Sequence, residues 1–131
     1  MIELNIAPFL SIKDIKNKGR GVFTSKDIAA GEIVEISPVL PLTEKERKEV
    51  EKTILYDYIF EWGHDTNDAC VAWGYVSLYN HSYDSNCEYE MDFSLNIISI
   101  RTVKDIKKGE ELTLNYNGDY DIKDPVWFEV K

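Results

Sequence analysis

Residues 79–87 read Tyr79-Asn80-His81-Ser82-Tyr83-Asp84-Ser85-Asn86-Cys87, and they follow directly on the apolar run from Ala72 to Tyr79. Small polar groups, amides and an imidazole are crowded into this short stretch. A segment that continues such an apolar run usually enters the interior, where an amide or imidazole without hydrogen-bond partners costs a few kcal/mol. Polar groups retained at that place indicate a functional site.

Two further blocks accompany this one. They read Lys18-Gly19-Arg20-Gly21-Val22-Phe23 and Gly109-Glu110-Glu111-Leu112-Thr113-Leu114-Asn115-Tyr116. Together the three blocks resemble the signatures of SET-domain protein lysine methyltransferases: a Gly-x-Gly cofactor loop, Asn-His-Ser-x-x-Pro-Asn, and a Gly-Glu-Glu-Leu turn that leads to a tyrosine. Each signature alone is short and weak. The ordered set, which spans nearly the whole chain, is specific.

Length and composition predict one globular domain over residues 1–131. The chain is 44% hydrophobic and 30% charged, as in ordinary globular proteins. No apolar stretch approaches the ~20 residues of a membrane-spanning helix, and the N-terminus lacks the pattern of a signal peptide. We therefore expect a cytoplasmic protein without a membrane partner, although delivery into a host cell or nucleus stays open. Cys70 and Cys87 are far apart and predict free thiols, and no metal site is indicated.

The net charge of −9 argues against direct binding of nucleic acid, which needs clustered lysine and arginine. An acidic surface attracts a basic partner instead, such as a lysine-rich protein tail. Solubility alone explains the charge equally well. The oligomeric state is open.

An internal echo predicts a β-rich fold. Residues 26–36 and 104–114 share the pattern Lys-Asp-Ile, two spacer residues, Gly-Glu and then apolar alternation. Each glycine is suited to a tight turn, and the alternation that follows predicts a strand. Strands are also expected before each copy, at about residues 21–24 and 96–101. The two similar units suggest internal pseudo-symmetry.

One helix is expected over residues 44–55. Thr43 and Glu46 form the pattern of a capping box, and Val50, Ile54 and Tyr58 are expected to face inward. The predicted class is thus mainly β (β-rich α+β) with one or two short helices. The resemblance implies more: several small twisted sheets and a threaded, knot-like C-terminal segment that brings the Asn80 segment near the Tyr116 segment.

The resemblance also implies a reaction, which is methyl transfer from S-adenosylmethionine to a lysine amine of a protein, with Tyr116 as the catalytic residue. The nucleophile must be the neutral amine, although free lysine has a pKa near ~10.4. By resemblance the cofactor-binding residues are Lys18, Gly19, Arg20, Gly21, Tyr58, Asn80, His81 and Trp127. The residues implied for the substrate channel are Tyr79, Tyr89, Tyr116 and Phe128. Ser82 and Asn86 are expected to brace the turn.

Simpler interpretations stand beside these roles. Tyr116 could be a core tyrosine at a strand end, His81 a hydrogen-bonded core histidine, and Tyr58 and Tyr89 ordinary packing residues. The chain also departs from the family pattern. Ser85 replaces the usual proline, no Tyr-x-Gly element occurs near residues 33–38, and no cysteine-rich segment follows Tyr116. Two other functions therefore remain open: a catalytically silent module that binds a basic peptide, and methylation of an amine that is not part of a protein.

Overall fold

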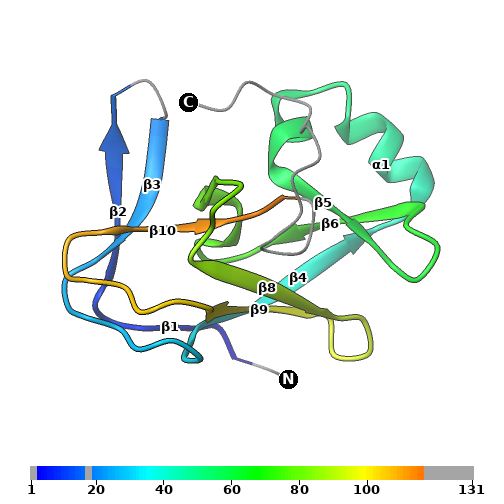
Figure 1. Cartoon of the computed structure of the whole chain (residues 1–131). Helices are drawn as coiled ribbons and strands as arrows, with labels where there is room; N and C mark the ends of the chain where they lie inside the picture. The colour runs from blue at the N-terminus through cyan, green and yellow to red at the C-terminus, as the bar shows by residue number, and fades with distance from the viewer. Residues whose placement is uncertain (1–2, 17–18, 117–131) are drawn as a thin grey trace.

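The computed structural model describes residues 3–16 and 19–116, and it is mainly β, as the sequence predicts (Figure 1). The N-terminal half contains β1 (Asn5–Ile6), β2 (Leu10–Ile15), β3 (Gly19–Thr24), β4 (Ile33–Leu42), α1 (Glu44–Val50), the 3-10 helix η1 (Ile54–Tyr58) and β5 (Ile59–Trp62). The C-terminal half contains β6 (Asp68–Ala72), the 3-10 helix η2 (Val76–Leu78), β7 (Asn80–His81), β8 (Cys87–Asp92), β9 (Ile97–Thr102) and β10 (Glu111–Leu114).

These strands form two sheets. The larger sheet has the order β5-β6-β4-β9-β8, and β1 pairs with β4 beside this path. The smaller sheet has the order β2-β3-β10-β7, in which β10 and β7 run parallel. The two edge strands of the larger sheet approach each other, because Phe60 of β5 and Tyr89 of β8 have ring centroids 5.9 Å apart. The sheet is therefore strongly curled.

The two similar sequence segments, residues 26–36 and 104–114, lie next to each other and are related by pseudo-symmetry. Ile28 and Ile106, which occupy equivalent positions in the two copies, exchange backbone hydrogen bonds of 2.8 Å and are both buried. The preceding aspartates are also equivalent: Asp105 accepts from the N–H of residue 30, and Asp27 accepts from the N–H of residue 108. The predicted internal pseudo-symmetry is confirmed.

The expected helix is shorter than the sequence suggested. The capping box of Thr43 and Glu46 is present, with both reciprocal hydrogen bonds. However, α1 ends at Val50, since the Thr53 hydroxyl donates to the Val50 carbonyl and accepts from the N–H of Leu55. Thr53 thus begins a separate 3-10 turn, in which Ile54 is 80% exposed. The prediction that Ile54 and Tyr58 face inward was wrong, because this change of helix type rotates them outward.

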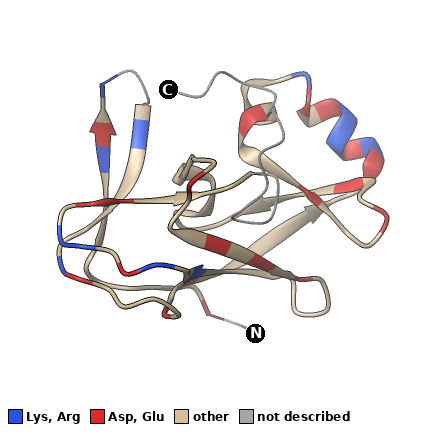
Figure 2. Ribbon diagram, in the orientation of Figure 1, with Lys and Arg blue, Asp and Glu red and all other residues tan. Residues whose placement is uncertain are grey.

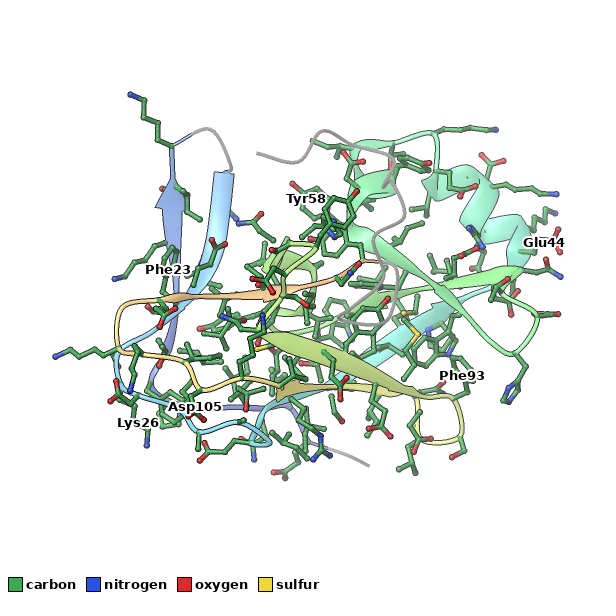
Figure 3. The ribbon with its side chains drawn as sticks, in the orientation of Figure 1. Phe23, Lys26, Glu44, Tyr58, Phe93 and Asp105 are labelled. Carbon is green, nitrogen blue, oxygen red and sulfur yellow. The ribbon has the colours of Figure 1, made fainter. Side chains whose placement is uncertain are left out.

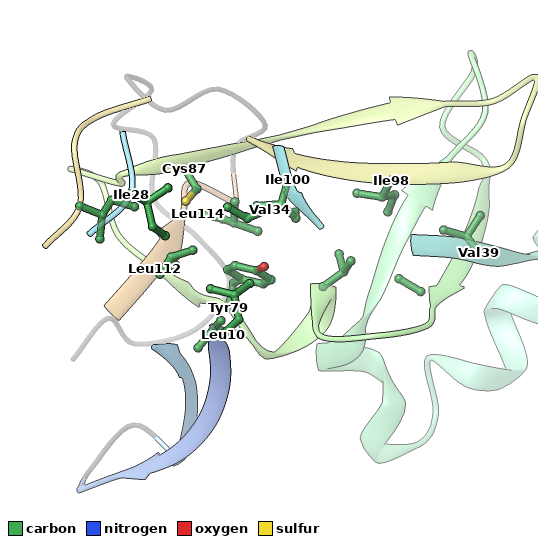
Figure 4. Close-up of a cluster of buried hydrophobic side chains, with 14 of the residues drawn as sticks. Leu10, Ile28, Val34, Val39, Tyr79, Cys87, Ile98, Ile100, Leu112 and Leu114 are labelled. Atoms are coloured by element: carbon green, nitrogen blue, oxygen red, sulfur yellow. The ribbon is translucent and has the colours of Figure 1, made fainter. Parts of the chain in front are cut away.

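The core lies between the two sheets (Figure 4). Aliphatic side chains of β4, β9 and β10 pack there around Tyr79, whose exposed fraction is zero. Across the described ranges, no helix combines the length and apolar character needed to span a membrane. The resemblance implied that the Asn80 segment lies near the Tyr116 segment, and the parallel pairing of β7 with β10 confirms this. Any part of the threaded arrangement after residue 116 lies outside the described residues.

Candidate active site

The parallel pair of β7 and β10 joins two of the sequence motifs. Asn80 lies opposite Thr113, and His81 lies opposite Leu114. Asn86 braces this pair from the side. Its amide donates to the Glu111 carbonyl at 2.8 Å, and its Oδ1 accepts the Thr113 N–H at 2.8 Å. These contacts hold side by side two segments that are about 30 residues apart in sequence. Parallel strands need such a long connection between them.

The third motif joins them through the Asn80 side chain. The Asn80 amide donates to the carbonyl of Arg20 at 2.9 Å and to the carboxylate of Glu111 at 2.7 Å. Gly21 permits this approach, since a Cβ at that position would lie 2.6 Å from Glu111 Oε2 and 3.0 Å from Asn80 Nδ2. Gly19 differs from Gly21: its φ is +81°, and no atom of residues 3–16 or 19–116 lies within 4 Å of an added Cβ. The three motifs therefore meet at one place.

Tyr116 is held at both of its ends. Its backbone N–H donates to Nδ1 of His81 at 3.0 Å, and its hydroxyl donates to the backbone carbonyl of Tyr79. Burial raises the pKa of Tyr116 well above the usual range for a phenol, and Tyr89, Glu111 and Tyr58 add smaller effects in the same direction. The hydroxyl is therefore neutral near pH 7. A neutral phenol that donates its proton to a carbonyl keeps its oxygen lone pairs available as acceptors.

The interaction between His81 and Tyr116 predicts a dependence of stability on pH. Burial lowers the pKa of His81, so the native state favours the neutral imidazole that accepts the Tyr116 N–H. Histidine in an unfolded chain titrates near ~6.5, so as the pH falls the unfolded state takes up its proton first. We expect the free energy of unfolding to fall from about pH 7 to about pH 5.5, as urea titrations would measure.

Two variants test this expectation. His81→Asn removes the titrating group and should flatten the dependence, whereas Asn67→Ala, at an exposed position without a titrating side chain, should leave it as in wild type. Equal slopes for the wild type and His81→Asn would contradict the assignment.

A cavity of about 460 Å³ opens beside Tyr116. It lies between the two edge strands, β5 and β8, below η1, and its lining includes Phe93, which Figure 3 labels. The aromatic and thioether side chains that line it are Tyr56, Phe60, Tyr89, Met91, Phe93 and Tyr116. Such a wall removes water from a bound group, and its ring faces attract cations.

Charged groups border the same cavity. Glu51, Asp57 and Glu61 contribute to its lining together with Arg47. The Arg47 guanidinium contacts Glu51 at 3.1 Å and Glu61 at 3.2 Å, and it also donates to the carbonyls of Thr66 and Asp68. These contacts fix α1 against the loop before β6. Three carboxylates against one guanidinium leave the cavity border acidic, and Figure 2 marks further acidic positions along β8.

The structure brings most of the predicted site residues together. Arg20, Gly21, Asn80 and His81 lie around the junction of β3, β7 and β10, and Gly19 is the first residue of β3. Tyr89 and Tyr116, both expected in a substrate channel, line the cavity. Tyr58 lies on η1, is 42% exposed, and is near enough to affect the pKa of Tyr116. Lys18, Trp127 and Phe128 lie outside the described residues.

The Tyr79 side chain does not lie where a channel residue would. Its ring is fully buried in the core, and its hydroxyl donates to Glu35 at 2.8 Å. The expectation that this side chain lines the channel is therefore wrong. The backbone carbonyl of Tyr79, in contrast, accepts the Tyr116 hydroxyl. The side chain points into the core because Glu35, a buried acid on β4, accepts a hydrogen bond from the phenol there.

Sequence reasoning missed two residues that shape the site. Glu111 was only part of a motif, yet its carboxylate holds the Asn80 amide. Glu35 was part of an alternating strand, yet it is 1% exposed. The position of Glu35 among the apolar residues of a predicted strand could have indicated its role, because ionised side chains are rarely buried without partners.

Potential metal ligands do not cluster in the described part of the chain: no group of three or more His, Cys, Asp or Glu residues there is arranged to hold an ion. Cys70 and Cys87 are both buried free thiols, and burial raises the pKa of each to about 12. They are therefore protonated near pH 7 and behave as small apolar side chains.

Comparison with known proteins identifies the family. The SET domain family model matches residues 19–117. A Schizosaccharomyces pombe histone-lysine N-methyltransferase, specific for H3 lysine 37, is 36% identical over 121 residues, which are 92% of this chain and 77% of that protein. The crystal structure of a candidate histone methyltransferase from Plasmodium falciparum aligns with a TM-score of 0.67 and 29% identity, over 85% of this chain and 95% of the other.

A second solved structure shares the fold. It is the Polycomb Repressive Complex 2 of Chaetomium thermophilum bound to GSK126, which aligns with a TM-score of 0.68 and 24% identity, over 86% of this chain and 16% of the matched chain. At that identity the likeness is evidence of the fold alone. With the family model covering the three joined motifs and the fission-yeast relative aligned over most of its length, this chain belongs to the SET-domain family of protein lysine methyltransferases.

Proposed function

We propose that this chain transfers a methyl group from S-adenosylmethionine to the side-chain amine of a lysine in a basic protein segment, with Tyr116 as the catalytic residue. The observation that carries the proposal is the Tyr116 hydroxyl, which is fixed on the Tyr79 carbonyl at the wall of an aromatic cavity. A neutral, immobilised hydroxyl beside a desolvated space is suited to orienting an amine.

The cofactor would be held where the three motifs meet. The Arg20 carbonyl accepts the Asn80 amide there, Gly19 precedes Arg20 at the start of β3, and His81 follows Asn80 on β7. The space at Gly19 suits a ligand that approaches main chain closely, because an added Cβ would meet no atom of the described residues within 4 Å. S-adenosylmethionine supplies, when bound, a sulfonium methyl group that a neutral amine can attack. We assign Gly19, Arg20, Asn80 and His81 to binding this group.

The cavity residues would favour the neutral form of the lysine amine and orient it. Burial among Phe60, Tyr89 and Tyr116 disfavours the ammonium form of a substrate amine and so lowers its pKa towards neutrality. The Tyr116 oxygen can then accept an N–H of the amine and aim the nitrogen lone pair. Transfer of the methyl group from the cofactor's sulfur to the amine would place positive charge on the nitrogen. The ring faces of the cavity stabilise that charge until the product loses a proton to water.

The substrate would be a basic segment. The net charge of −9 and the acidic border formed by Glu51, Asp57 and Glu61 both favour lysine- and arginine-rich partners, which they attract over a Debye length of ~8 Å at physiological salt. The Schizosaccharomyces pombe relative, which is named a histone-lysine N-methyltransferase, agrees with this class. A silent binding module would need the acidic border alone. It would not need a hydroxyl fixed on a carbonyl beside the motif junction.

The test is transfer of a labelled methyl group from S-adenosylmethionine to core histones and to a bacterial lysate. We expect label in a discrete protein band, and mass spectrometry should place it on a lysine. Free lysine in the same assay should stay unlabelled, which separates protein methylation from methylation of a small amine. Calorimetry with S-adenosylmethionine completes the test. A chain that neither labels a protein nor binds the cofactor would support the silent binding module.

A further inference from the structure

One buried acid is unexplained by the site described so far. Glu35 lies in the middle of β4 and is 1% exposed, although burying a carboxylate costs several kcal/mol unless hydrogen bonds compensate. Its Oε2 accepts the Ser37 hydroxyl at 2.5 Å and the Tyr75 N–H at 2.8 Å. Its Oε1 accepts the Tyr79 hydroxyl at 2.8 Å. An apolar side chain would fill the same space at less cost, so these contacts call for a reason beyond packing.

The chain before Asn80 is shaped to lie on this carboxylate. Gly74 has a φ of +75°, and an added Cβ would lie 2.4 Å from Glu35 Oε2 and 2.6 Å from Ser37 Oγ. Only glycine lets the backbone pass so closely and adopt this conformation without strain. The Tyr75 N–H follows at once as a donor to the same oxygen. Glu35 therefore fixes where residues 74–79 run.

Tyr79 links Glu35 to the hydroxyl of Tyr116. Its phenol end is bound to Glu35, its ring is packed inside the core (Figure 4), and its backbone carbonyl accepts the Tyr116 hydroxyl. A tyrosine side chain has only two rotatable angles, so fixing the hydroxyl also fixes the ring and restricts the main chain of the same residue. Because misplacement by about 1 Å can lower a rate about 100-fold, the carbonyl position matters.

We propose that Glu35 is a positioning residue for methyl transfer: through the Tyr79 hydroxyl it holds the Tyr79 carbonyl where that carbonyl aligns the hydroxyl of Tyr116. This inference rests on the proposed function. It assigns no contact between Glu35 and substrate, since the carboxylate acts through Tyr79. If Glu35 contributed to stability alone, loss of the Ser37 hydroxyl and loss of the Tyr79 hydroxyl would affect activity equally.

The chain offers a matched pair of variants to separate these roles. Tyr79→Phe and Ser37→Ala each remove one hydroxyl that donates to Glu35, and both residues are fully buried. We expect similar losses of stability, measured by urea unfolding. We expect Tyr79→Phe alone to lower kcat, by about tenfold, with KM for a histone H3 peptide changed less than about twofold. Equal kcat values in the two variants would overturn the inference.

A conservative variant provides a second readout. Glu35→Gln keeps an acceptor for the Tyr75 N–H, and its amide can donate to the Tyr79 oxygen, so kcat should fall less than in Glu35→Ala. Crystal structures of wild type and Tyr79→Phe without substrate separate this inference from the proposed function. We expect the separation between the Tyr116 hydroxyl and the carbonyl of residue 79 to lengthen in the variant. An unchanged contact would overturn the inference, whether or not the wild type transfers methyl groups.

Discussion

Tyr116→Phe is expected to lower kcat for methyl transfer on the order of 100- to 1000-fold and to leave the Kd for S-adenosylmethionine within about twofold. The phenylalanine ring fills the same place between His81 and the cavity, so the wall keeps its shape. What disappears is the hydroxyl that donates to the Tyr79 carbonyl and whose oxygen would orient the amine. Without it, a bound amine can rotate among unreactive orientations.

Single-turnover kinetics with a histone H3 peptide measure this effect separately from product release. Tyr83→Phe is a suitable control, because it also removes one phenol oxygen while keeping the ring that packs edge-on against His81. It should retain kcat within about threefold. Near-wild-type kcat in Tyr116→Phe would contradict the catalytic assignment and leave Tyr116 as a core tyrosine at a strand end.

The motif residues were selected from the sequence by their resemblance to the short signatures of a known family. Gly21 and Asn80 belong to two such signatures, which lie about 60 residues apart in the chain. Their meeting depends on the parallel pairing of β7 with β10, in which Asn80 lies opposite Thr113. No periodicity within a strand specifies its parallel partner, since such pairing is set by packing across the whole domain. The resemblance to a family supplied that information.

Two errors in the sequence analysis have physical causes. The helix was extended past Val50 because the apolar spacing continued, but the Thr53 hydroxyl competes for the Val50 carbonyl and ends it. Tyr79 was assigned to the channel from the resemblance to the family. Its phenol is instead bound by Glu35, 44 residues earlier in the chain, and a contact over that distance leaves no trace in local sequence. The side chain of Tyr79 therefore packs in the core, whereas its backbone carbonyl contacts Tyr116 at the candidate site.

Asn86→Ala is expected to lower the free energy of unfolding by about 3 kcal/mol. The Asn86 side chain satisfies the Glu111 carbonyl and the Thr113 N–H, both at 2.8 Å, and neither partner would gain a replacement from alanine. Each lost bond costs about 1 kcal/mol, and the groups left unpaired in a partly buried place add a desolvation penalty. The loss is a large fraction of the stability of a domain of this size.

Urea unfolding followed by tryptophan fluorescence measures this change, and two variants sharpen its interpretation. Asn67→Ala, at an exposed position before β6, should change stability by less than about 0.5 kcal/mol. Asn86→Asp keeps an acceptor for the Thr113 N–H but places a carboxylate against the Glu111 carbonyl, so it should be destabilised at pH 7 and recover partly as acid protonates it. If Asn86→Ala were as stable as Asn67→Ala, the amide would not hold β10 beside β7. The position of Tyr116 would then depend on the backbone pairing and His81 alone.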